Sequence, residues 1–191
     1  MEYNNPHQMG GQQEFYSYLN SICNFLNFGF AFHKRLANQN RKFAVRGWGR
    51  VHDRQTHHDA DKLICFEKIL CDKLGWCPTY DYAKLSEVNS IKINSMESFK
   101  QHHVIWKQHE KSIVPTLNKA IHEARTVDIE IYQFLICLLD KVQKEIMRID
   151  MICGSLEFAG WNTHDVSVKS KWLHEQEEKG EITHDVNANI G

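Results

Sequence analysis

One of the long helices that this sequence predicts has an apolar buried face over only half of its length. Between residues 48 and 74, apolar side chains of the second half recur at helical spacing, namely Leu63, Phe66, Ile69, Leu70 and Leu74. Carried back in helical steps, the same face falls on His52, Thr56 and Asp59. Three further metal-competent side chains flank it: His57, His58 and Asp61. Because buried polar groups need a partner, water or an ion, this half of the helix predicts a polar site inside the protein.

Two spacings in this segment are those of metal ligands. His57-x-x-x-Asp61 and His58-x-x-Asp61 each place an imidazole and a carboxylate on one face of a helix, within reach of one cation. Imidazole and carboxylate together suit Fe(II), Mn(II) or Zn(II). His33 should face the apolar side of the preceding helix, and Glu145 lies close to the apolar stripe of the last long helix. The candidate metal ligands are therefore His33, His57, His58, Asp61 and Glu145. The alternative for His33 is a hydrogen-bonded core residue.

The periodicity predicts four long helices, near residues 13–37, 48–74, 94–125 and 126–153. Gly75 and Pro78 end the second helix, Glu97 can complete a capping box on Asn94, Thr126 can cap the fourth helix, and Pro115 should kink the third. Residues 79–88 predict a short helix in the long connection. No strand pattern and no repeat is present, so the fold class is all-α.

The lengths of the connections predict the topology. Short links should make the first and second helices antiparallel, and likewise the third and fourth, with the longer passage between the second and third as a crossover. We expect a polar tail at residues 1–12, a four-helix bundle at residues 13–156 and a C-terminal extension at residues 157–191, with a short helix near residues 166–180.

The composition is that of an ordinary globular domain. The chain has 191 residues, 42% of them hydrophobic, a net charge of -1 and no apolar run long enough for a membrane span. Its N-terminus carries no secretory signal pattern. The six cysteines form no C-x-x-C pair and are predicted to be reduced thiols in a cytoplasmic protein. No Lys or Arg precedes Lys34 and the C-terminus is acidic, so DNA binding through the tails is not expected.

Over residues 13–156 the chain resembles the ferritin-like superfamily. The segment NKAIHEARTVDIEIYQFLICLLDKVQKEI is similar to the corresponding helices of ferritins and Dps-type miniferritins. The segment EKILCDKLGWCPTYDYAKLSEV resembles miniferritins, which carry a short helix in this connection. The resemblance implies a homo-oligomeric hollow shell of 12 or 24 subunits that binds, oxidises and stores iron and protects against oxidative stress. Zinc or manganese are the alternatives to iron.

The resemblance does not extend to a complete ligand set. Ferritins need glutamate on the first helix, Glu-x-x-His on the second and glutamate on the third. Thr56 and Asp59 stand at the Glu-x-x-His positions, or His58 and Asp61 in a register shifted by two, and Trp106 replaces the third-helix glutamate. Only Glu145 remains at a ferritin accessory position.

The miniferritin pattern is likewise incomplete. His33 resembles its first-helix histidine, and His57-x-x-x-Asp61 has the spacing of its second helix. Glu67 aligns with the last carboxylate only in a register that leaves His57 out of place. The sequence therefore predicts a ferroxidase with non-standard ligands, an altered or partly lost centre, or a non-catalytic structural subunit of the same fold without metal.

A hemerythrin-like metal binder is a third interpretation. It is prompted by four histidines: His102, His103, His109 and His122. It is disfavoured because Trp106 and Lys107 stand where the H-x-x-x-H partners of His102 and His103 are needed. The apolar stripe of the third helix takes in His103 or His102, and otherwise we expect these histidines on a solvated face or paired with carboxylates such as Glu110 and Glu123.

Overall fold

The computed structural model describes the backbone of residues 6–179, and the side chains of residues 13–173 and of Glu175. Within that range the chain is helical without a strand, which confirms the all-α fold class. The helices are α1 (Pro6–Lys42), α2 (Arg46–Leu74), α3 (Tyr82–Val88), α4 (Met96–Val127), α5 (Ile129–Phe158) and α6 (Thr163–Lys179).

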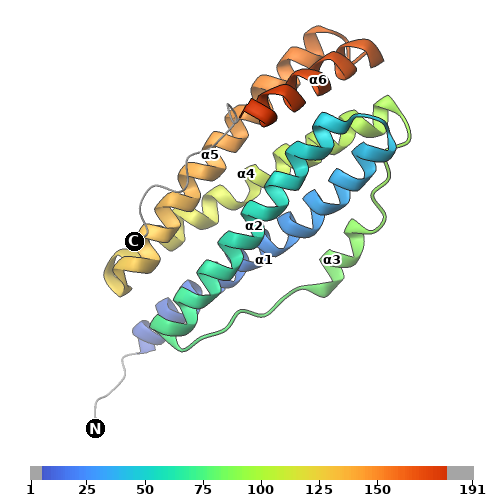
Figure 1. The fold of residues 1–191 in the computed structure, drawn as a ribbon. Helices are drawn as coiled ribbons and strands as arrows, with labels where there is room; N and C mark the ends of the chain where they lie inside the picture. The colour runs from blue at the N-terminus through green and yellow to red at the C-terminus, as the bar shows by residue number, and fades with distance from the viewer. Residues whose placement is uncertain (1–5, 180–191) are drawn as a thin grey trace.

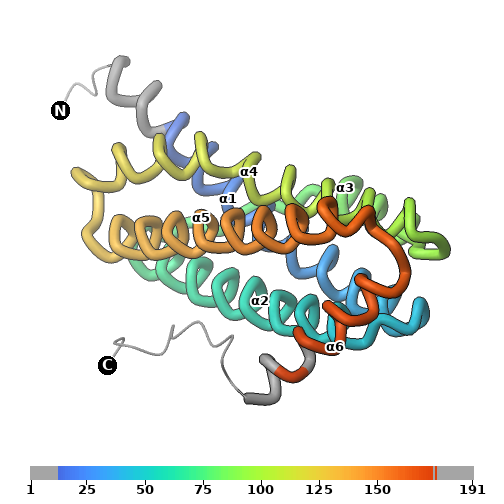
Figure 2. Tube along the Cα trace, turned by 90° about the horizontal axis from the view of Figure 1, so that it is seen from above, coloured from blue at the N-terminus to red at the C-terminus, as the bar shows by residue number. Residues whose placement is uncertain are grey.

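The four long helices α1, α2, α4 and α5 lie side by side (Figures 1 and 2). α1 packs against α2 and α4, α5 packs against α4 and α2, and α6 folds back against α2. α1 and α2 run in opposite directions, as do α4 and α5 (Figure 1). The predicted antiparallel pairs are therefore confirmed.

The connection between α2 and α4 runs along α1 and contains α3 (Figure 1). Near its start, Thr79 N donates to Asn20 Oδ1 at 2.8 Å. Near its end, Arg35 Nε donates to Ile91 O at 3.0 Å. Asn20 and Arg35 are separated by about 22 Å along the helix axis, so polar side chains of α1 hold the connection in place. The predicted crossover and its short helix are confirmed.

α1 is longer than predicted. It begins at Pro6 and ends at Lys42, so the prediction of a tail is wrong for residues 6–12, and residues 1–5 lie outside the described chain. Proline is well tolerated in the first turn of a helix because its missing N–H needs no partner there. The polar composition of this segment thus did not mark a helix boundary.

The helix starts also differ in their caps. Ser95, not Asn94, caps α4 and forms a capping box with Ser98 rather than Glu97. Asp128, not Thr126, caps α5, and its carboxylate accepts from the backbone N–H groups of Glu130 and Ile131. The sequence offered adjacent candidates at both boundaries, and a one- or two-residue error is usual there. The end of α2 at Leu74, with Gly75 in the left-handed conformation, is as predicted. None of the described helices is both long and apolar enough to cross a membrane.

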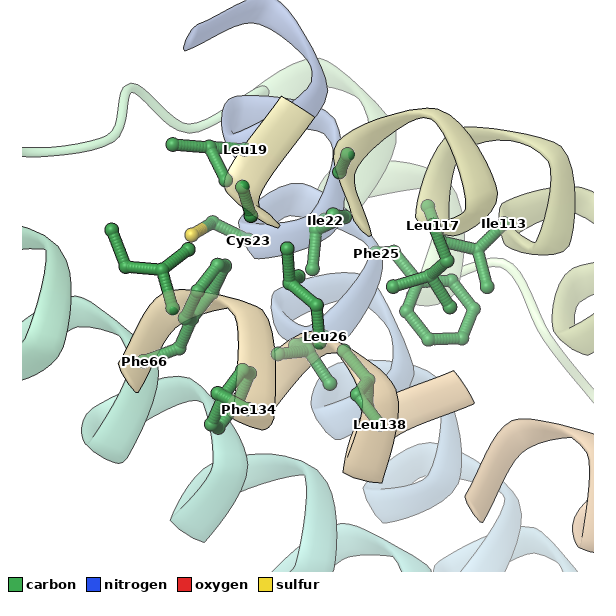
Figure 3. Close-up of a cluster of buried hydrophobic side chains, with 14 of the residues drawn as sticks. Leu19, Ile22, Cys23, Phe25, Leu26, Phe66, Ile113, Leu117, Phe134 and Leu138 are labelled. Atoms are coloured by element: carbon green, nitrogen blue, oxygen red, sulfur yellow. The ribbon is translucent and has the colours of Figure 1, made fainter. Parts of the chain in front are cut away.

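The buried apolar side chains form two clusters. The first includes Leu19, Leu26, Phe66, Leu117 and Leu138 (Figure 3). The second includes Leu36, Trp48, Phe99, Trp106 and Ile149, and takes in Leu173 of α6. α6 lies close to α2 at Gly47, whose N–H donates to Ser170 Oγ at 3.0 Å. The two clusters occupy different levels of the same four helices, which defines the position of the site described next.

Candidate functional site

Between the two apolar clusters, each long helix contributes a buried polar side chain. These are His33 on α1, Asp59 on α2, Glu110 on α4 and Glu145 on α5, with exposed fractions of 0%, 7%, 5% and 3%. We call these four residues the polar layer. Along each helix they lie between a member of the first cluster and a member of the second: Leu26 and Leu36, Phe66 and Val51, Ile113 and Trp106, and Val142 and Ile149. Four helices therefore place one polar side chain each at a common level of the interior.

His33 lies close to two other members of this layer. Its Nε2 atom lies 4.0 Å from Asp59 Oδ2 and 4.0 Å from Glu110 Oε1. Its other ring nitrogen, Nδ1, lies 2.9 Å from Nδ1 of His52, in the first half of α2. One of these two imidazoles donates and the other accepts. His33 therefore faces carboxylates with one nitrogen and is oriented by His52 through the other.

Two cationic side chains of α5 reach the same layer. Lys141 Nζ lies 3.5 Å from Asp59 Oδ1, and Arg148 Nη1 lies 3.5 Å from Glu145 Oε2. Each cation thus pairs with one carboxylate of the polar layer. Glu110 is the carboxyl group that neither pair includes.

Burial sets the protonation of the histidines. Burial, followed by the nearby charges of His109 and Lys141, holds the pKa of His33 well below its usual 6.5. Burial also holds the pKa of His52 well below that value and lowers those of His103 and His109 to about 4. These imidazoles are therefore neutral at pH 7, which is the form that binds metal ions.

Burial acts on the carboxyl groups in the opposite sense. It raises the pKa of Asp59 to about 6, although the ammonium of Lys141 opposes the change. Burial, together with the negative charges of Asp59 and Glu145, holds the pKa of Glu110 well above 4.5. Glu110 therefore favours its protonated, neutral form. The two cations, Lys141 and Arg148, are then matched by the two carboxyl groups with which they pair, Asp59 and Glu145.

A glycine of α1 gives the Asp59 carboxylate its room. A Cβ atom at Gly29 would lie 2.7 Å from Asp59 Oδ2 and 3.4 Å from His109 Nε2. The first distance is too short for a normal contact, so any larger residue at position 29 would push the carboxylate. The sequence of α1 is thus fitted to the polar layer at this point.

The structure divides the predicted metal ligands into two groups. His33 and Glu145 are buried in the polar layer, whereas His57 and Asp61 are exposed and His58 is half-buried. His57, His58 and Asp61 line a shallow hollow on the outer side of α2 together with Arg50, Asp53 and Arg54. The five candidates therefore do not meet at one site.

The helical period explains this division. Successive residues of a helix are rotated by about 100°, so positions two residues away from Asp59 point to the opposite side. His52, Thr56 and Asp59 are buried as the sequence predicted. The residues with metal-ligand spacings, His57, His58 and Asp61, lie beside that buried face and are turned toward the surface.

Sequence reasoning missed the burial of Glu110 and the surroundings of His109. His103 is buried, at one of the two positions that the apolar stripe allowed, and Glu110, which was considered only as a partner of these histidines, is buried as well. The prediction of a solvated face is wrong for His109, which stacks on Phe25 with ring centroids 4.3 Å apart. A signal was present, because Glu110 follows His103 by seven residues and Trp106 by four. These are positions of the same apolar stripe that runs from Phe99 to Leu117.

The polar layer suits a metal ion in its chemistry but not in its present arrangement. His33 Nε2 and Glu145 Oε1 have no hydrogen-bond partner within the described part of the chain, so donor atoms are available. However, no three His, Cys, Asp or Glu side chains among the described residues are placed to hold a metal ion together. Binding therefore requires these side chains to move toward one another.

Comparison with models of known protein families gives no match, and a search of curated protein sequences gives none either.

Proposed function

We propose that this chain is a ferritin-like protein that binds Fe(II) as a substrate in the polar layer and oxidises it. The observation that carries the proposal is the convergence of His33, Asp59, Glu110 and Glu145 from four helices at one level between two apolar clusters. Burying an imidazole and three carboxyl groups is costly unless they have a ligand or partners. Antiparallel helix pairs joined by one long crossover also form the topology of ferritin-like proteins.

The donor pattern is a reduced version of the ferritin-like di-iron pattern. That pattern has glutamate on two helices and Glu-x-x-His on the other two. Glu110 supplies one glutamate, and Glu145 begins a Glu-x-x-Arg sequence in place of Glu-x-x-His. Asp59 and His33 take the place of the remaining donors of that pattern. With fewer donors than the di-iron pattern, the layer suits a single ion, and Mn(II) or Zn(II) fit the same donors as iron.

Each member of the layer would have a defined role. Neutral His33 would offer Nε2 to the ion while its Nδ1–H donates to His52, the arrangement that usually orients a metal-binding histidine. The carboxylates of Asp59 and Glu145 would supply negative charge, and Glu110 would release its proton as the cation enters. Each Fe(II) gives up one electron when it becomes Fe(III), so two Fe(II) ions, one hydrogen peroxide and two protons would give two Fe(III) ions and two water molecules. Storage of the product and protection against oxidative stress would follow from this reaction.

The second candidate is a non-catalytic subunit of the same fold without metal. The ion pairs of Lys141 with Asp59 and of Arg148 with Glu145 favour it, because they already neutralise two of the three carboxyl groups. In this case the polar layer would fix the register of the helices. The two candidates differ in whether the native chain takes up a divalent cation.

Assembly into a homo-oligomeric shell is part of the proposal. α5 exposes a line of large apolar side chains, Met147, Met151 and Phe158, and exposed apolar patches are typical of protein contacts. All six cysteines are free, which supports a reducing, cytoplasmic setting. Light scattering should give the mass of 12 or 24 copies of the 22.4 kDa chain. A monomer at all concentrations would refute the shell.

Anaerobic titration with Fe(II), followed by exposure to air, tests the proposed reaction. We expect saturable binding and an absorbance rise as Fe(III) forms. Asp59→Asn and His33→Ala should abolish both. The matched controls Asp61→Asn and His57→Ala, on the outer side of α2, should leave both unchanged. Absence of binding to the native protein, or loss only in the outer variants, would refute the proposal.

A further inference from the structure

Lys141 occupies an unusual place for a lysine. Its side chain is 16% exposed, its ammonium nitrogen is buried, and that nitrogen has no hydrogen-bond partner among the described residues. It lies one helical turn before Glu145 on α5 and 3.5 Å from Asp59 Oδ1. Its partner Asp59 comes from the helix packed against α5. The lysine therefore points into the interior at the level of the polar layer.

The charge of Lys141 acts on three of the four members of that layer. It lowers the pKa of Asp59 and Glu110 against the effect of burial, and it contributes to the lowered pKa of His33. A metal ion bound at the position of this ammonium would act on the same three donor groups. The arrangement also accounts for the absence of a ready-made metal site among the residues that the structure describes, because one oxygen of Asp59 is turned to the ammonium.

We infer that Lys141 is a built-in cation that competes with a divalent metal ion for the polar layer and so sets the metal affinity of the site. This inference rests on the proposed function, since it concerns the same site. An ammonium and a divalent ion beside one carboxylate repel each other strongly in a buried setting. Entry of the metal ion therefore requires Lys141 to leave Asp59.

The side chain of Lys141 can make this movement. Lysine carries its charge on a flexible four-carbon stem, and such stems readily lie along apolar surface while the ammonium reaches water. Since part of the side chain is already exposed, a change of rotamer along this stem is the movement that would bring the ammonium to solvent. Asp59 Oδ1 would then be available to the metal ion.

Titration of Mn(II) into the native protein, Lys141→Met and Lys141→Gln tests the inference, with calorimetry as the readout. Removal of the competing charge should tighten Mn(II) binding on the order of 10- to 100-fold, the usual size of coupling between two binding events. Lys141→Arg keeps the charge and should bind Mn(II) like the native protein. The matched control is Lys144→Met on the same helix, where the lysine is 59% exposed and pairs with Asp140.

A second measurement uses the native chain alone and needs no variant to fold. The amine of Lys141 should react slowly with an acetylating reagent in metal-free protein and faster with saturating Mn(II), as quantified by mass spectrometry. The amine of Lys144 should react equally in both. Unchanged or slower labelling of Lys141 in Mn(II)-saturated protein would overturn the inference.

The outcomes separate the inference from the proposed function. If the native protein binds Mn(II) and the Met and Gln variants bind no more tightly, the inference is wrong and the proposed function stands. If the native protein binds none and both variants bind, the inference holds and metal binding by the native chain is refuted. If native protein and both variants bind none, both are refuted.

Discussion

Replacement of His109 by phenylalanine should remove part of the protein's sensitivity to acid. His109 lies among aromatic rings of α1, with centroid distances of 4.3 Å to Phe25, 5.0 Å to Phe28 and 6.2 Å to Phe32. Its Nε2 atom is buried and has no hydrogen-bond partner in the described part of the chain. Phenylalanine matches this surrounding and removes the unsatisfied nitrogen, so we expect a gain of about 1–3 kcal/mol in the free energy of unfolding at pH 7.

The pH dependence follows from the lowered pKa. Burial lowers the pKa of His109 from 6.5 to about 4, so between these pH values the unfolded chain binds a proton that the folded chain does not. The free energy of unfolding therefore falls as the pH falls through this window, by about 3 kcal/mol in total for this one group. The loss is about 2 kcal/mol at pH 5. His109→Phe should lose that much less than the native protein between pH 7 and pH 5.

Urea unfolding followed by circular dichroism at pH 7 and pH 5 measures this difference. Buried histidines that do not interact with His109 contribute equally to both proteins and cancel in the comparison, whereas the pKa of His33, which His109 also lowers, shifts upward in the variant and adds to the expected difference. His122→Phe is the matched control, because His122 is an exposed histidine of the same helix and its replacement should leave the native pH dependence intact. Equal losses of stability in the native protein and in His109→Phe would refute the assignment of a half-buried, neutral imidazole.

Substitutions at two glycines lead to further predictions. At Gly47 a Cβ atom would overlap the carbonyl oxygen of Ser170, so Gly47→Ala should displace α6 and lower the free energy of unfolding by about 1–3 kcal/mol. The control Gly154→Ala, with nothing within 4 Å of its Cβ, should raise it by about 1 kcal/mol; equal thermal midpoints for the two variants would contradict the close contact with α6. Gly29→Ala should push the Asp59 carboxylate and weaken Mn(II) binding as measured by calorimetry, and an unchanged affinity would show that this contact does not shape the site.

Helical periodicity was sufficient to predict most of the fold. The inward face of α2, including its polar half at His52, Thr56 and Asp59, follows from extending the spacing of Leu63 and Leu70 backward. The crossover follows from connection length. The inward face of α2 depends on local residue spacing, and the crossover depends on the number of residues between helices. Both quantities can be counted in the sequence.

The candidate site was only partly predictable, because it depends on contacts between helices. Glu110 lay on the apolar stripe of α4, but charged residues are rarely buried and the stripe was interpreted without it. Lys141 gave no signal of its own, since a lysine near an apolar face usually extends to solvent. Its role depends on Asp59, more than 80 positions away in the chain, and no spacing rule connects the two.

The polar layer is not the only interaction between the four helices. The apolar clusters on either side already bury large side chains, such as Phe66 in the first and Trp106 in the second. Replacing buried ion pairs by apolar residues of similar volume is often neutral or stabilising. A layer of one imidazole, three carboxyl groups and two cations is therefore expected to serve a purpose other than stability, which is metal binding under the first proposal and helix register under the second. Because Lys141 already supplies a positive charge where a metal ion would act, the function of the layer depends on whether that charge stays or leaves.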